Sequence, residues 1–376
     1  MHTEQAGKSL IKHLTLIAFT LFTLVSLNAC QSQQVFQQRF LQFGTIIDIS
    51  LVTKDQDKAL QIFNEIETLL KRHHTEWHGW QDGTLKQFNQ ALLSQTTTET
   101  ETGVPIPETL RLLIHDSKKY FDLSGGLFNP AMGKLIEAWG FHQQATPNLT
   151  LIEKIKQDIP GMHDLIIKNN HAMTLNPYLQ LDFGAIAKGL AVKQISHLIQ
   201  QHHIKDFIIN AGGDIFAAGQ KQGKDWQIAI ENPFYTDENS ETVIARLPVS
   251  GPQSIFTSGN YRRFYVDKNN LKRHHIIDPV SGEPSLNISA ITVMHKDPVI
   301  ADIAATTLML TKISELKNMA EILEIKDFLA ISDQHELYIT KSMMKKIEWT
   351  NESAFKVQLL HNQINPAEPS QINSNE

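Results

Sequence analysis

The chain has 376 residues, of which 41% are hydrophobic and 20% charged, with a formal net charge of -6. This length suits one large domain or two packed ones. The sequence has no basic patch interleaved with aromatic residues, which argues against a nucleic-acid-binding protein. It has 17 histidines but one cysteine and no His-Glu-x-x-His pattern, which argues against a zinc site.

The first 30 residues have the pattern of a bacterial lipoprotein leader. Lys8 and Lys12 precede an uncharged apolar run, which ends in Leu-Asn-Ala before Cys30. The run of about 14 residues is shorter than the roughly 20 of a membrane-spanning helix, although a single anchor remains the alternative. We therefore predict a signal peptide over 1–29, lipidation of Cys30, and a location at the periplasmic face of a membrane. The glutamine-rich residues 30–39 are predicted to be a tether.

The rest of the chain mixes helix and strand patterns without strict alternation, which predicts an α+β fold with mixed sheets and packed helices over 40–350. Strands are expected at 43–52, 207–209, 226–230, 288–294, 328–332 and 336–339. Helices are expected at 58–70, 107–120, 151–157, 185–200 and 302–310. A loop is expected at 96–107, and residues 351–376 are polar and predicted to be disordered.

Three glycine-containing segments are candidates for backbone contact with a ligand. The segment 123–141 holds Gly-Gly-Leu-Phe-Asn-Pro, which by itself is also an ordinary loop before a helix. The segment 181–190 starts a helix beside glycines and is a weak indication of phosphate binding. The segment 209–219 runs from a strand into Gly-Gly-Asp, which is either a tight turn or a close approach to a ligand.

Two further segments carry titratable side chains. In 257–283, His275 lies near the turn that contains Asp278, and either group is a candidate acid or base near neutral pH. In 298–310, Asp302 and Thr306 are four residues apart, so on a helix they share a face. That pair is half of a hard-cation site or a structural hydrogen bond.

Taken together, these segments resemble one family. The order FGT, SGGLFNP, LDFGAIAKG, NAGGDI, TSGNYRR…HIIDPVSG and DPVIADIAATTLML, from about Phe40 to Ile339, is similar to the FAD:protein FMN transferases, the ApbE lipoproteins. The resemblance implies a body of two subdomains that binds FAD with Mg²⁺. It implies transfer of FMN onto a threonine or serine of a respiratory-type flavoprotein, with release of AMP.

The resemblance also implies roles for individual residues. Ala187, through its backbone carbonyl, would bind the metal with Asp302 and Thr306. His275 would lie next to FAD, and the sequence does not decide whether His275 or Asp278 deprotonates the incoming hydroxyl. The residues expected to contact FAD are Phe43, Trp80, Leu127, Phe128, Asn129, Gly184, Leu190 and Ile277.

The chain departs from the family pattern at three places. Asn129 stands where many members have aspartate, and Ala305 stands where some have a second carboxylate. A family tyrosine has no clear counterpart, so Trp77 or Trp80 is expected to stack on a ring of FAD. Two alternative functions stay open: an FAD pyrophosphatase that yields FMN and AMP, and a non-catalytic FAD-binding lipoprotein.

Overall fold

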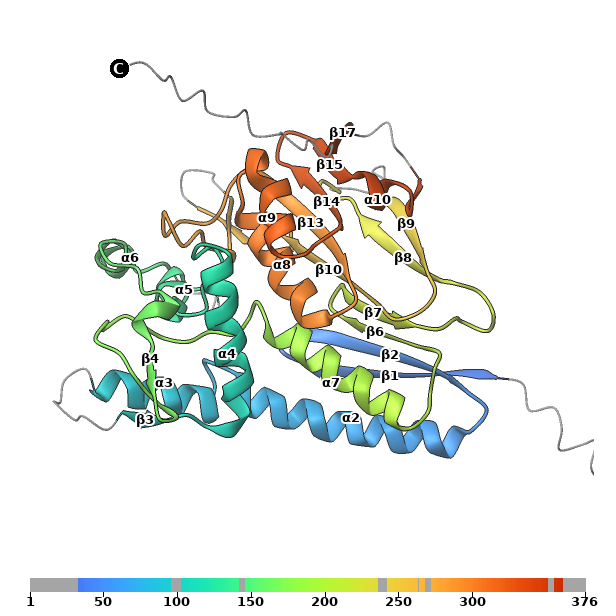
Figure 1. Ribbon diagram of the computed structural model, residues 1–376, viewed down its shortest axis with the longest axis horizontal. Helices are drawn as coiled ribbons and strands as arrows, with labels where there is room; N and C mark the ends of the chain where they lie inside the picture. The colour runs from blue at the N-terminus through green and yellow to red at the C-terminus, as the bar shows by residue number, and fades with distance from the viewer. Residues whose placement is uncertain are drawn as a thin grey trace, which may run out of the picture.

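A nine-stranded sheet forms the centre of the computed structural model, which describes residues 33–95, 103–141, 146–235, 242–262, 264–267, 272–350 and 355–360 (Figure 1). Its strands, in spatial order, are β1 (Gln34–Gln42), β2 (Thr45–Thr53), β6 (Phe207–Ala211), β7 (Asp214–Ala218), β10 (Gln253–Gly259), β13 (Ile288–His295), β14 (Asp327–Ser332), β15 (Glu336–Thr340) and β17 (Lys356–Leu360). Neighbours are antiparallel except for the parallel pair β15 and β17.

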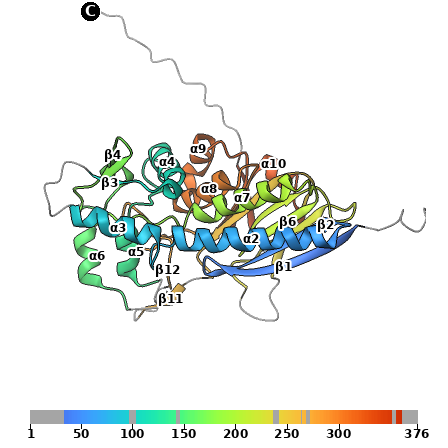
Figure 2. The same ribbon diagram turned by 90° about the horizontal axis from the view of Figure 1, so that it is seen from below.

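The two faces of this sheet are covered differently. Helices α2 (Gln56–Trp77), α7 (Ala187–Gln201) and α8 (Pro298–Leu310) pack on one face, as Figure 2 also shows. A small sheet of β16 (Glu348–Trp349), β9 (Val243–Val249) and β8 (Trp226–Glu231) packs on the other. Successive side chains of a strand point to opposite faces of the sheet. In β14, Phe328 therefore packs with the helices on one face, whereas Leu329 packs with the small sheet on the other.

A helical lobe lies beside the sheet (Figure 1). It contains α3 (Thr84–Gln95), α4 (Glu108–Leu123), α5 (Gly133–Trp139) and α6 (Leu149–Ile155), with a sheet of β3 (Val104–Pro105), β5 (His171–Met173) and β4 (Ile166–Lys168). Leu85 and Leu110 of the lobe belong to the same apolar cluster as Ile49 of the main sheet. A division into two subdomains stays a prediction.

The remaining elements are short. They are the hairpin of β11 (Phe264–Val266) and β12 (Lys272–His274), the 3₁₀ turns at Met162–Asp164 and Ile313–Glu315, and the helices α9 (Leu316–Ile322) and α10 (Lys341–Met344). No helix among the described residues has the length and apolarity needed to cross a bilayer.

The α+β class is confirmed, and two sequence predictions about the ends of the fold are wrong. Residues 34–39 are not a tether but the first part of β1, which pairs with β2 along all nine of its residues. Residues 356–360 are not a disordered tail but β17, which pairs with β15. Strands pair through hydrogen bonds between backbone groups, which do not depend on the side chains. An edge strand can therefore have a polar sequence. The predicted signal peptide and the predicted lipidation site Cys30 lie outside the described residues.

Candidate functional site

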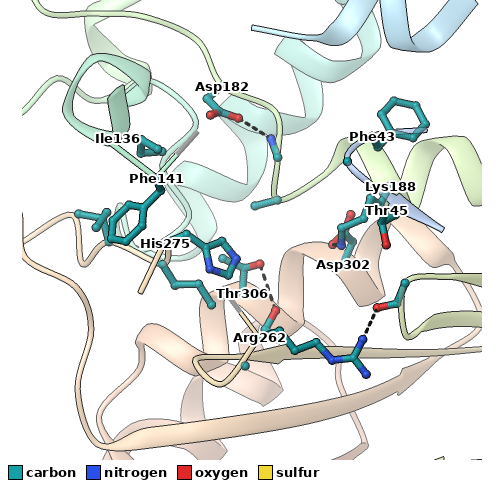
Figure 3. A pocket seen from close by; sticks show the side chains of 18 of the residues that line it. Phe43, Thr45, Ile136, Phe141, Asp182, Lys188, Arg262, His275, Asp302 and Thr306 are labelled. Carbon is teal, nitrogen blue, oxygen red and sulfur yellow. Dashed lines mark hydrogen bonds and ion pairs between the residues drawn. The ribbon is translucent and has the colours of Figure 1, made fainter. Parts of the chain in front are cut away.

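A cleft of about 2070 Å³ lies where one end of the main sheet meets the helical lobe. The sheet contributes the β1–β2 turn, the β6–β7 turn and the end of β10, whereas the lobe contributes the segment before α5. Helices α7 and α8 and the β11–β12 hairpin complete the walls (Figure 3). The cleft exceeds the roughly 300–1,000 Å³ of ordinary small-molecule pockets, so it has room for a dinucleotide and part of a second reactant.

A lysine and two carboxylates from three elements meet in this cleft. Lys188, in the first turn of α7, forms an ion pair with Asp214 of β7, and its Nζ lies 3.4 Å from Oδ1 of Asp302 on α8. The backbone N–H of Gly189 donates to Asp302 Oδ2 at 2.7 Å, and that of Thr257 donates to Asp214 Oδ1 at 3.1 Å. The side chains of Asp302 and Asp214 are only 4% and 7% exposed.

This low exposure changes the acid–base properties of the cluster. Burial raises the pKa of Asp302 to about 6, although the nearby Lys188 ammonium lowers it. Burial by itself lowers the pKa of Lys188, but the carboxylates Asp214 and Asp302 outweigh burial and raise it. The ammonium therefore stays charged at neutral pH, and the cluster is an environment that stabilises a cation.

Hydroxyl groups extend the cluster along β10. Ser258 Oγ and Thr306 Oγ1 are 3.4 Å apart, and Thr257 Oγ1 lies 2.9 Å from the hydroxyl of Thr292. Asp302, Thr306 and Ala187, the three predicted metal ligands, all line the cleft. Oxygen donors of this kind suit Mg²⁺, which usually takes one or two protein carboxylates together with substrate phosphates and water. Among the described residues, no three His, Cys, Asp or Glu side chains form a metal-binding group.

Glycines allow the close approach of these elements. A Cβ at Gly189 would lie 2.6 Å from the carbonyl oxygen of Pro298 and 2.8 Å from Asp302 Cβ, so a side chain there would push α7 away from α8. Gly212, in the β6–β7 turn, has a φ of +70°, and a Cβ there would collide with the hydroxyl of Thr45. The Gly-Gly-Asp segment is therefore a tight turn that carries Asp214 into the cleft wall.

Aromatic side chains line two separate walls of the cleft. On one wall, Phe43 stacks near Trp77 with 6.4 Å between the ring centroids, and Trp80 follows α2. On the other, Phe141 lies 5.4 Å from the ring of Tyr265 in β11. Figure 3 shows Phe43 and Phe141 on opposite sides of the view. Both walls offer flat apolar surfaces on which a ring system can stack.

Arg262 adds a cation at the edge of the cleft. Its Nη2 lies 2.6 Å from each carboxylate oxygen of Glu231, and its Nη1 donates to the carbonyl oxygen of Gly212 at 3.3 Å. The neighbouring Tyr261 donates to Glu231 at 3.3 Å. Burial, followed by the Glu231 charge, raises the pKa of Tyr261 to about 12.

His275 follows β12 and reaches the cleft, whereas His274 beside it points into the protein. His274 is 2% exposed, and its Nε2 lies 2.7 Å from the carbonyl oxygen of Ser285. Burial lowers the pKa of His274. The buried ring and its hydrogen bond hold the segment from which His275 extends.

Most of the predicted site residues meet in the cleft. The ones that line it are Phe43, Trp80, Leu127, Phe128, Asn129, Gly184, Ala187, His275, Ile277, Asp302 and Thr306. Trp77, the alternative to Trp80, lines it as well. The sequence interpretation did not assign Lys188, Asp214 or Arg262 to the site, although the first two lie in segments that it singled out for their glycines.

Two predicted residues are not brought to the cleft. Leu190 is 3% exposed and packs within the helical core. Asp278 supports its own turn: Oδ1 accepts from the N–H of Val280 at 2.9 Å, and Oδ2 accepts from Ser281 Oγ at 3.0 Å. The carboxylate of Asp278 is thus a turn-stabilising group, and of the two candidate bases only His275 lines the cleft.

Several known proteins are similar to this chain. The FAD:protein FMN transferase of Rhodobacter capsulatus is 28% identical over 315 residues, which are 83% of this chain and 58% of that protein. The chain thus spans less than two thirds of that relative. The FAD:protein FMN transferase of Vibrio cholerae is 30% identical over 276 residues, covering 71% of this chain and 78% of that protein. The FAD:protein FMN transferase of Haemophilus influenzae is 28% identical over 366 residues, covering 92% of this chain and 100% of that protein.

Solved structures share the fold. An ApbE protein from Thermotoga maritima superimposes with a TM-score of 0.72 at 21% identity, covering 83% of this chain and 99% of that chain. The flavin transferase ApbE from Vibrio cholerae gives a TM-score of 0.70 at 24% identity, covering 84% of this chain and 99% of that chain. A model of the ApbE family matches residues 43–329, which include every element that lines the cleft. The chain therefore belongs to the ApbE family.

Proposed function

We propose that this protein transfers the FMN part of FAD to a threonine or serine hydroxyl of a target flavoprotein and releases AMP. The cleft is the observation that carries the proposal. FAD has two ring systems joined by a diphosphate, which matches a cleft with two aromatic walls and a charged cluster. The similar proteins from Rhodobacter capsulatus, Vibrio cholerae and Haemophilus influenzae are named FAD:protein FMN transferases, which supports the same reaction.

The residues of the cleft suit the steps of such a transfer. The acceptor hydroxyl oxygen forms a bond to the FMN phosphorus, and the bond from that phosphorus to the bridging oxygen of AMP breaks. His275 is the group that takes the proton of the hydroxyl. The Lys188 ammonium offsets charge on the diphosphate, and Ser258 offers a hydrogen bond to a phosphate oxygen.

We propose that the reaction depends on Mg²⁺. Asp302, Thr306 and the carbonyl of Ala187 would bind the ion, and their oxygen donors fit it. When bound, Mg²⁺ neutralises the charge that develops on the diphosphate. A cation is already favoured at this place, because the Lys188 ammonium lies between two buried carboxylates.

Mass spectrometry of an acceptor protein tests the proposal. The enzyme, Mg²⁺ and FAD are incubated with a candidate respiratory flavoprotein subunit, and an added FMN on a threonine or serine supports the transferase. Free FMN and AMP without an adduct would indicate a pyrophosphatase, and unchanged FAD would indicate a binding protein. Calorimetry is expected to show tighter binding of FAD than of FMN, because the AMP half adds contact area.

We also propose that the mature chain begins at Cys30 and is anchored by acyl chains at the periplasmic face of a bacterial membrane. The leader pattern supports this location. Cys30→Ala is expected to give unprocessed or soluble protein, and the wild type is expected to incorporate a labelled acyl chain. Membrane association without any acyl label in the wild type would contradict the anchor.

A further inference from the structure

The two ends of the nine-stranded sheet differ in function and in charge. The cleft occupies the end with the β1–β2 and β6–β7 turns. At the opposite end, which we call the basal end, β1, β6, β10 and β14 begin, whereas β2, β7, β13 and β15 finish. In Figure 1 the start of β1 lies on the far side of the sheet from the helical lobe.

The segments next to these strand ends are rich in lysine. We define the basal segments as residues 54–55, 204–206, 219–225, 250–252, 296–297, 324–326 and 341–346. Eight exposed lysines in them form no ion pair with a described residue: Lys54, Lys205, Lys221, Lys224, Lys296, Lys326, Lys341 and Lys345. Four acidic residues there are likewise outside ion pairs: Asp55, Asp206, Asp225 and Glu324.

The acidic residues offset this charge only in part. Asp55 caps α2 by accepting from the N–H of Lys58 at 2.9 Å. Asp206 accepts from the N–H of Gln220 at 2.8 Å, and Asp225 accepts from the side chain of Gln220 at 2.9 Å. The basal end is therefore positive in a chain whose formal net charge is -6. Such an asymmetry produces a local positive field that the net charge conceals.

The N-terminal segment leaves the folded body at the same end. β1 begins at Gln34, and the side chain of Gln222, in a basal segment, donates to the carbonyl oxygen of Gln33 at 2.8 Å. Only Gln31 and Ser32 separate Gln33 from Cys30. An anchor at Cys30 would thus hold the basal end close to the lipid headgroups. The nine residues of β1 place the cleft about 30 Å from that end, at roughly 3.3 Å per residue.

We propose that the basal end is a docking surface for an anionic lipid bilayer and that it turns the cleft away from the membrane. The location of the chain's exit and the unpaired lysines point to the same partner. Lysines close to anionic headgroups attract them over a Debye length, which is about 10 Å at 0.1 M salt. The lysine contacts restrict the tilt of the body, which an acyl anchor by itself does not do.

Vesicle binding by the chain from Gln31 onward tests the surface without any acyl chain. All described core residues follow position 33, so this chain carries the whole fold. It is expected to co-sediment with phosphatidylcholine vesicles that contain phosphatidylglycerol, to release at high salt, and not to bind pure phosphatidylcholine. The variant Lys54→Gln/Lys221→Gln/Lys224→Gln is expected to lose affinity roughly tenfold or more.

A matched variant removes the same charge elsewhere. Lys119 of α4, Lys154 of α6 and Lys168 of β4 are exposed residues of the helical lobe, and their replacement by glutamine is expected to leave vesicle binding unchanged. Equal loss in both variants, absence of binding to the anionic vesicles, or equal binding to duplex DNA would overturn the proposal. None of these six lysines lines the cleft, so FMN transfer in solution reports separately on the proposed enzyme activity.

Discussion

Replacing Lys188 by methionine is the sharpest test of the charged cluster. Methionine keeps a long, unbranched side chain but removes the ammonium that lies between Asp214 and Asp302. Both carboxylates then keep one backbone donor each: the N–H of Thr257 for Asp214 and the N–H of Gly189 for Asp302. The variant is therefore expected to fold with a lower free energy of unfolding.

The size of the effect follows from the exposure of the groups. Breaking a fully buried ion pair costs about 3–5 kcal/mol. The Lys188 side chain is 30% exposed, and water and the two backbone donors stabilise part of the remaining charge. We therefore expect a loss of about 2–3 kcal/mol at neutral pH, below the fully buried case.

The effect is expected to depend on pH. The folded-state pKa of Asp302 is raised to about 6, above the usual value of about 3.9. The folded state thus binds this proton more tightly than the unfolded state, so the associated stability is present below about pH 4 and is lost as the pH rises through about 6. Without the ammonium the pKa of Asp302 rises further. The difference between variant and wild type is expected to be smaller at about pH 4.5, where Asp302 is protonated in both proteins, than at about pH 8, whereas the loss of the Lys188–Asp214 ion pair contributes at both.

Urea unfolding in metal-free buffer at about pH 4.5 and about pH 8 measures this difference. The matched control is Lys193→Met on the same helix. Lys193 pairs with Asp297 at the surface, with side chains 51% and 29% exposed, so its loss is expected to cost about 0–1 kcal/mol at either pH. A Lys188→Met variant as stable as the control, or one whose deficit is the same at both pH values, would refute the reasoning.

Asp302→Asn is expected to reduce FMN transfer by at least about 10²-fold with an unchanged melting temperature, because it removes the charged ligand of the proposed metal site. Mass spectrometry of the acceptor checks this, and surviving Mg²⁺-dependent transfer would put the metal elsewhere. His275→Ala is expected to slow transfer by about 10²-fold or more; an unchanged rate would make His275 structural. His274→Leu leaves the Ser285 carbonyl without its partner and is expected to cost about 1–3 kcal/mol in chemical denaturation. An unchanged unfolding midpoint would argue against that hydrogen bond. Gly212→Ala forces a Cβ onto Thr45 at positive φ and is expected to lower stability by at least about 1 kcal/mol. A melting temperature equal to that of the wild type would contradict that strain.

Local patterns predicted most interior elements of the fold but not β10, which lies in the middle of the main sheet, and they predicted neither edge strand. The apolar period of 58–70 reflects one buried helix face, and it lies within α2, which continues to Trp77. The β-rich run 43–52 became β2 at Thr45–Thr53. β1 and β17 are edge strands that pair on one side only, and their sequences carry glutamine and lysine. Burial leaves a pattern in the sequence, but a backbone hydrogen bond to a neighbouring strand does not.

The chemistry of the site divides in the same way. By itself the sequence determined the family, the order of the glycine-rich motifs and the helical spacing that puts Asp302 and Thr306 on one face. It did not determine that Lys188 meets Asp302, 114 residues away, or that Asp214 joins them. It also left His275 and Asp278 equivalent, whereas in the folded chain one lines the cleft and the other holds a turn. Spacing along a helix or strand is set by backbone geometry and can be read locally. The meeting of distant side chains depends on the packing of α7, α8 and the sheet, which only the tertiary structure decides.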